Sequence, residues 1–146
     1  MTSGRAVAAA TGPVGYALSE AAKAHRAQLQ LRVGPLGLHL GQELLLVDVH
    51  EHPGTTQAEL VQRLGFEQPT VAKAITRMER TGFVARAADP ADRRVTRLRL
   101  TERGEAAVQE VVTAWADADR ASTSGLTEAE TTELTRILNK IRDNRP

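Results

Sequence analysis

Residues 65–101 read GFEQPTVAKAITRMERTGFVARAADPADRRVTRLRLT, and this stretch decides the fold. Apolar residues of its first half recur at the three- and four-residue steps of one helix face: Val71, Ala74, Ile75 and Met78. The pattern predicts a helix that begins near Glu67 and ends at Gly82. Pro69 is compatible with its first turn, because the amides of that turn have no partner within the helix.

Two short strands follow this helix, at 83–87 and 95–100. In the second strand, Leu98 and Leu100 alternate with arginines, which predicts one buried and one exposed face. The Asp-Pro pair and the charged residues at 89–94 mark the turn between the strands. The stretch therefore predicts a helix followed by a hairpin with a charged tip.

Helical patterns surround this stretch, at 14–33, 40–52, 56–64 and 101–121 and from 127 onward. Thr56-Gln57-Ala58-Glu59 and Thr127-Glu128-Ala129-Glu130 are capping boxes that begin two of these helices. The expected fold is mainly α with a small β-hairpin wing. It is a winged helix-turn-helix domain at 40–100 with dimerisation helices at 14–39 and 101–146.

The terminal helices carry apolar stripes that a small central domain cannot fully cover. Examples are Leu18, Ala22, His25 and Leu29 in the first helix, Val108, Val111, Val112 and Trp115 in the fifth, and Leu134, Ile137, Leu138 and Ile141 in the last. These stripes indicate a helical dimer interface. The alternative is that they fold back on their own chain.

Composition excludes several classes of protein. The chain has 146 residues and no cysteine, so a disulfide framework, a thiolate zinc site and a cysteine redox switch are excluded. No apolar run is long enough to span a membrane. The first 13 residues, MTSGRAVAAATGP, lack the features of a secretory signal and are expected to form a flexible arm of a cytoplasmic protein.

The positive charge is localised, although the net charge is only +1. Residues 67–104 contain nine Lys and Arg against five Asp and Glu, a net +4, whereas residues 105–146 contain five against eight, a net −3. A basic segment that combines a helix and a hairpin is what phosphate binding requires. A solvated surface with scattered charge is the alternative.

The helix and the hairpin suit a reader of double-stranded DNA. A helix can enter the major groove, and a basic hairpin tip can reach the backbone or the minor groove. Candidate DNA-binding residues of the helix are Gln68, Pro69, Thr70, Lys73, Thr76 and Arg77. Candidate phosphate contacts are Arg97 of the hairpin and Thr55 and Thr56, whose first role is to cap a helix.

The chain resembles the MarR family of bacterial transcriptional regulators from about residue 14 to 143. Residues 88–104, ADPADRRVTRLRLTERG, resemble the wing signature of that family, and Glu-Gln-Pro-Thr at 67–70 resembles its SlyA-like branch. In the wing, the resemblance implies that Arg94 reaches into the minor groove and that Asp92 orients it. Arg93 is a neighbouring candidate that the sequence does not separate from Arg94.

The same resemblance implies a homodimer on a pseudo-palindromic operator, with a cleft for a small-molecule effector. Candidate ligand residues are His25, His39 and Trp115, and the ligand is expected to be phenolic or anionic. Core or helix-end histidines are the plainer interpretation, and a zinc site is a further one. No cofactor or metal is expected.

The expected function is that of a repressor that a small molecule releases from DNA. A winged-helix module that binds protein instead of DNA is the alternative. An enzyme is not expected, because the sequence contains no phosphate loop, catalytic triad order or metal-ligand cluster.

Overall fold

A computed structural model describes residues 3–146. The chain forms two compact units, one of Leu29–Trp115 and one that combines the described residues up to Gln28 with Ala116–Pro146. We call the first the winged unit and the second the terminal unit. Within the described residues, no helix is long and apolar enough to cross a membrane.

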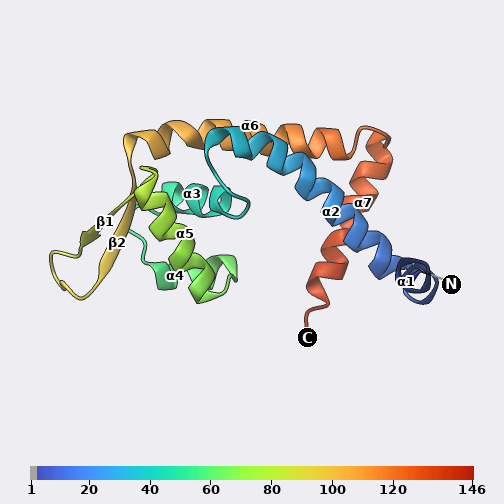
Figure 1. Cartoon of the computed structure of the whole chain (residues 1–146), viewed down its shortest axis with the longest axis horizontal. Coiled ribbons are helices and arrows are strands. Elements are labelled where there is room, and N and C mark those ends of the chain that lie inside the picture. The colour runs from blue at the N-terminus through green and yellow to red at the C-terminus, as the bar shows by residue number, and fades with distance from the viewer. Residues whose placement is uncertain (1–2) are drawn as a thin grey trace. The chain divides into compact units, whose positions relative to one another are not determined.

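Three short helices and a hairpin make up most of the winged unit: α3 (Gln42–Glu51), α4 (Gln57–Leu64), α5 (Gln68–Arg80), β1 (Val84–Ala88) and β2 (Thr96–Leu100) (Figure 1). Glycine ends α4 because Gly65 adopts a φ of 67°, a backbone conformation that L side chains rarely adopt. The predicted fold class, mainly helical with a small hairpin wing, is confirmed.

The hairpin is antiparallel, and Val84 pairs with Leu100 at its base. A bridge between Thr55 and Leu98 adds the turn between α3 and α4 to the other edge of β2. The Gly54 amide donates to the Leu98 carbonyl, and the Leu98 amide donates to the Thr55 carbonyl, each over 2.8 Å. The wing is therefore fixed by backbone hydrogen bonds to the segment that precedes α4.

The core of the winged unit is mainly aliphatic, as the low aromatic content requires, with Phe83 also fully buried in it. The predicted stripe of α5 faces this core, with Val71, Ile75 and Met78 fully buried and Ala74 partly buried. Leu98 is also fully buried, whereas its neighbour Arg99 is exposed, as the alternation predicts. This packing leaves the polar side of α5 in solvent.

Two long helices contribute to both units: α2 (Pro13–Val33), followed by a 3₁₀ turn at Gly34–Leu36, and α6 (Glu102–Ser122). The terminal unit also contains α1 (Gly4–Thr11) and α7 (Glu128–Asp143). The apolar residues of α7 are 36–41% exposed in the single chain, so its apolar stripe has no complete cover there: Leu134, Ile137, Leu138 and Ile141.

One local prediction differs from the structure. The segment expected to be a flexible arm contains α1, an Ala-rich helix whose N-cap Ser3 accepts the Ala6 amide. Residues 1 and 2 of that predicted arm lie outside the described residues. On α6, Val111 of the predicted stripe is buried, Val108 and Trp115 are partly buried and Val112 is 42% exposed, so this stripe is not fully covered in the single chain.

Candidate nucleic-acid interface

The polar side of α5 carries the predicted helix residues, and all of them are exposed: Gln68, Pro69, Thr70, Lys73, Thr76 and Arg77. Pro69 lies in the first turn, as its missing amide allows. The opposite side of the helix holds the core residues. Their packing fixes the rotation of α5 and keeps the polar face in solvent. A helix fixed in this way can offer donors and acceptors to base edges.

The hairpin tip presents one arginine in a defined orientation. Arg94 donates from Nε to Oδ1 of Asp92 over 3.0 Å and from Nη2 to Oδ2 over 3.1 Å. This pairing holds the pKa of the Asp92 carboxyl below its ordinary value, with the Arg94 amide as the second cause. The Arg94 side chain is nevertheless 91% exposed. Asp92 pairs with Arg94 and not with Arg93, a distinction that the sequence could not make.

The predicted phosphate contacts lie in a different environment. Thr55 is 4% exposed, and its hydroxyl donates to Glu59 and accepts from Arg63. The Thr56 hydroxyl accepts the Glu59 amide as the helix cap of α4. The Arg97 guanidinium donates to Asp89 and to the Gly54 carbonyl. All three side chains are thus used within the fold.

Arg86 of β1 is a further basic residue at this surface that the sequence prediction omitted. Its Nη2 donates to the Thr76 hydroxyl over 3.0 Å, and its Nε lies 3.6 Å from a Glu79 oxygen. It therefore links the wing to the exposed side of α5. The sequence did contain a signal for this residue. Arg86 is the one long, charged side chain in the strand Val84–Ala88, and such a side chain is expected to point toward solvent.

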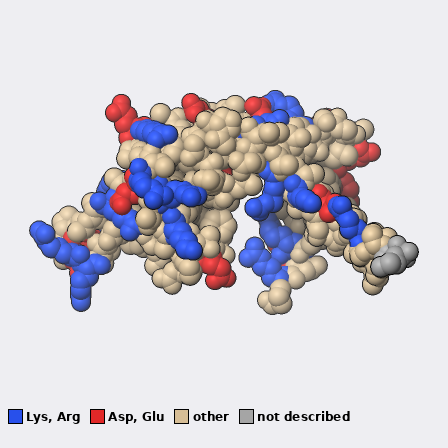
Figure 2. Space-filling model, viewed as in Figure 1, with Lys and Arg blue, Asp and Glu red and all other residues tan. Residues whose placement is uncertain are grey.

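Basic side chains gather on the winged unit at the hairpin tip and around α5 (Figure 2). The basic residues of these elements include Lys73, Arg77 and Arg80 on α5, Arg86 on β1, and Arg93 and Arg94 at the tip. Because the partners of Arg94 and Arg86 lie within the same surface, the patch is ordered as well as charged. An ordered cationic surface beside an exposed helix is complementary to the negatively charged phosphates of a DNA duplex.

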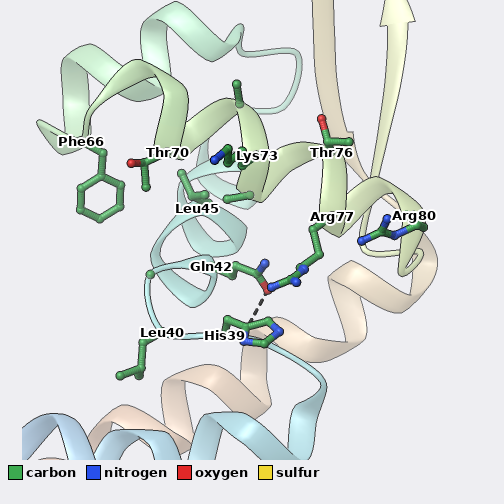
Figure 3. A pocket seen from close by; sticks show the side chains of 13 residues that line it. His39, Leu40, Gln42, Leu45, Phe66, Thr70, Lys73, Thr76, Arg77 and Arg80 are labelled. Carbon is green, nitrogen blue, oxygen red and sulfur yellow. Dashed lines mark hydrogen bonds between the residues drawn. The ribbon is translucent and has the colours of Figure 1, made fainter.

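A pocket of about 610 Å³ opens beside α5 within the winged unit. One wall is basic, with Lys73, Arg77 and Arg80, and the other contains Leu45 and Phe66. Figure 3 shows His39, Gln42 and Arg77 close together on one side and Phe66 and Thr70 farther along. The His39 amide donates to the Gln42 side chain over 3.0 Å, which fixes that corner of the pocket.

Of the three predicted ligand residues, only His39 lines this pocket. Nδ1 of His25 hydrogen bonds to the Ser122 hydroxyl over 2.8 Å within the terminal unit. Trp115 packs, partly buried, against the core of the winged unit. The described residues contain no cluster of three His, Cys, Asp or Glu that could hold a metal ion.

Comparison with known proteins identifies relatives of this architecture. Residues 38–96 match the sequence model of the MarR family. The transcriptional regulator SlyA is 29% identical, with a TM-score of 0.75 over 87% of this chain and 89% of that one. BpsR of Bordetella bronchiseptica, described in terms of the regulation of its DNA binding by 6-hydroxynicotinic acid, is 28% identical, with a TM-score of 0.80 over 90% and 94%.

A MarR variant from E. coli in complex with operator DNA is 22% identical. Its TM-score is 0.81, over 92% of this chain and 96% of that one, and at this identity the likeness concerns the fold alone.

Proposed function

We propose that this chain, whose residues 38–96 match the MarR family, is a cytoplasmic, homodimeric, sequence-specific DNA-binding regulator of transcription of that family. The observation that carries the proposal is the pairing of an exposed polar helix face with a wing arginine held by a carboxylate. A protein-binding module of the same fold has no need of that pairing.

In this proposal, α5 reads the major groove. Gln68 pairs with adenine and Arg77 with guanine, and the Thr70 methyl group contacts thymine. Lys73 serves a base or a phosphate, which would position the protein without specifying sequence. The exposure of these side chains on a helix whose other face is packed supports this assignment.

The wing is proposed to insert Arg94 into the minor groove. A narrow minor groove concentrates negative potential and attracts arginine. The bidentate contact with Asp92 lowers the entropic cost of ordering the side chain before it meets DNA. Arg93 at the same tip is then free for the phosphate backbone.

A second copy of the chain is proposed to cover the apolar stripe of α7. An exposed stripe of Leu and Ile residues on an amphipathic helix is costly in a single soluble chain. A two-fold dimer would place two winged units on a pseudo-palindrome, with half-site centres about 10 base pairs apart.

The effector is proposed to be a small anion with an apolar ring, bound in the pocket beside α5. Phe66 and Leu45 suit a ring, and Arg77, Lys73 and His39 suit a carboxylate or a phenolate. The description of BpsR, whose DNA binding is regulated by 6-hydroxynicotinic acid, supports this chemistry. The ligand releases the repressor from DNA only if it prefers the unbound form.

The decisive experiment is fluorescence anisotropy with the protein's own upstream promoter DNA and with scrambled DNA at about physiological salt. We expect a preference of about a thousandfold or more for the promoter. Weak and equal binding to both DNAs would contradict the proposal and favour a protein-interaction module.

Two variants test the assigned residues in the same assay. Arg94→Ala should weaken binding to all sequences and reduce the salt slope by about one unit. Gln68→Ala should instead reduce the discrimination between promoter and scrambled DNA. Arg120→Ala, an exposed arginine of α6, is the charge-matched control and should change neither quantity. Unchanged affinity in both test variants would disprove the site assignment.

A further inference from the structure

The wing tip contains a second carboxylate, Asp89, with contacts unlike those of Asp92. Its Oδ1 accepts the backbone amides of Ala91 over 2.7 Å and of Asp92 over 3.2 Å. Its Oδ2 accepts Nε of Arg97 over 2.8 Å. The two oxygens thus join the turn at the tip to a side chain of β2, and the Asp89 side chain is only 18% exposed.

Arg97 extends this connection to the helix-turn-helix. Its Nη1 donates to the Gly54 carbonyl over 3.2 Å, in the turn that precedes α4. Gly54 is itself fixed, since its amide donates to the Leu98 carbonyl. One guanidinium therefore bridges the wing tip and the segment from which α4 begins. Two different nitrogens of the Arg97 side chain make these contacts, Nε with Asp89 and Nη1 with the Gly54 carbonyl.

The connection reaches Arg94 through Asp92. The amide of Asp92 is held by Asp89, and the carboxylate of Asp92 holds Arg94. Within the described residues, no other side chain pairs with Arg94. The place at which Arg94 is offered to solvent therefore depends on the conformation of the turn that Asp89 fixes.

We propose that Asp89 and Arg97 are positioning residues for DNA binding: they fix the wing tip against the helix-turn-helix so that Asp92 presents Arg94 to the minor groove. This role rests on the proposed function. It replaces the role predicted for Arg97 from the sequence, a direct phosphate contact.

For a neutral residue at position 89, the proposal predicts weaker DNA binding, whereas electrostatics alone predicts stronger binding. Asp89 is a negative charge on a surface that meets DNA, so its neutralisation should strengthen binding if charge alone matters. Asp89→Asn keeps an oxygen for the two backbone amides but turns an NH₂ group toward the Arg97 guanidinium. If Asp89 positions the tip, this variant binds DNA more weakly.

The first test needs no DNA. In NMR spectra of the full-length protein, we expect solvent exchange of the Arg97 Nε–H group to be several-fold faster in Asp89→Asn than in the unaltered protein. Asp119→Asn, an exposed carboxylate of α6, changes the net charge equally and should leave this exchange unchanged. Equal exchange in all three proteins would show that Asp89 does not hold the Arg97 guanidinium.

The second test is promoter affinity by anisotropy. Asp89→Asn and Arg97→Lys should each weaken binding about tenfold, the effect of losing one charge-assisted hydrogen bond. In an Arg94→Ala background, Asp89→Asn should have no further effect, because Asp89 acts through Arg94. A purely structural role would persist in that background.

Three outcomes would overturn the proposal: tighter or equal binding by Asp89→Asn, full affinity of Arg97→Lys, or an additive effect in the Arg94→Ala background. Failure of the unaltered protein to prefer its promoter would instead remove the proposed function and this role with it. The exchange experiment would still decide whether Asp89 holds Arg97 in place, so the two failures are distinguishable.

Discussion

The winged and terminal units differ in how much of their apolar surface they bury. All the fully buried hydrophobic residues among the described residues lie in the winged unit, except Ala118. The terminal unit instead exposes large apolar residues on α1, α2 and α7. The winged unit therefore has a core of its own, whereas the terminal unit lacks the burial that normally offsets chain entropy.

This difference separates two roles within one chain. In the unit that carries the predicted DNA-binding residues, contacts within the unit itself hold the helices and the wing in place. The terminal unit exposes apolar side chains of the kind that line interfaces between subunits, and a second chain would cover them. Changes in the two units should accordingly have different consequences for stability, assembly and DNA binding.

The largest effect should come from breaking the apolar stripe of α7. Ile137→Glu with Leu138→Glu places charges on the surface assigned to the partner, so we expect monomers in sedimentation velocity. Promoter affinity should fall by about a hundredfold or more, because the second winged unit no longer binds as part of the same molecule.

The winged unit should remain folded in this variant, as amide hydrogen exchange of α4 and α5 would report. Asn139→Glu, on the polar side of α7, is the matched control and should stay dimeric. A dimeric double variant would show that the stripe does not form the interface.

A smaller effect should come from the tightest backbone approach in the winged unit. A Cβ atom on Gly104 in α6 would collide with the Phe83 carbonyl oxygen at the base of the wing. Gly104→Ala should therefore lower the free energy of unfolding by about 1–3 kcal/mol, although alanine usually favours a helix.

Gly15→Ala in α2 tests the same substitution where a Cβ meets nothing within 4 Å. This control should raise stability by about 0.5–1 kcal/mol in urea unfolding. A Gly104→Ala protein as stable as the control would contradict the close approach.

The smallest effects should come from the two capping boxes, which make the same contacts in different units. Thr56→Ala and Thr127→Ala should each cost about 1 kcal/mol. The loss at Thr56 should be independent of protein concentration. The loss at Thr127 should depend on concentration, because folding of the terminal unit is coupled to assembly. Thermal unfolding at several concentrations distinguishes the two, and identical behaviour would argue against the division into units.

Most of the fold could be predicted from local sequence patterns. Helix periodicity, the two capping boxes and the glycines at 65 and 82 are short-range signals, and each element lies within a few residues of its predicted position. The helix at Gly4–Thr11 was missed because its small residues give no apolar periodicity. The buried alanines of α6, Ala107, Ala114 and Ala118, were not predicted, because the larger valines dominate the apolar pattern of that helix.

The site was less predictable because its contacts join distant parts of the chain. The exposed face of α5 follows from helix geometry alone, whereas Asp92 and Arg94 are two residues apart in the hairpin turn, and only the structure shows that Asp92 holds Arg94 and not Arg93. The contact of Arg97 with the Gly54 carbonyl, 43 residues away, has no local signature. The same holds for the burial of Thr55 under Arg63, which a capping motif does not reveal.

Thr70, Lys73 and Arg77 belong both to the pocket and to the face proposed to read DNA. If the proposed function holds, a substitution at one of these three positions that adapts the pocket to a new effector would also alter the operator that the protein prefers. A substitution at Leu45 or Phe66, which line only the pocket, would leave the reading face unchanged. A duplicated copy that acquires a new signal through the shared positions would have to acquire new target sites at the same time.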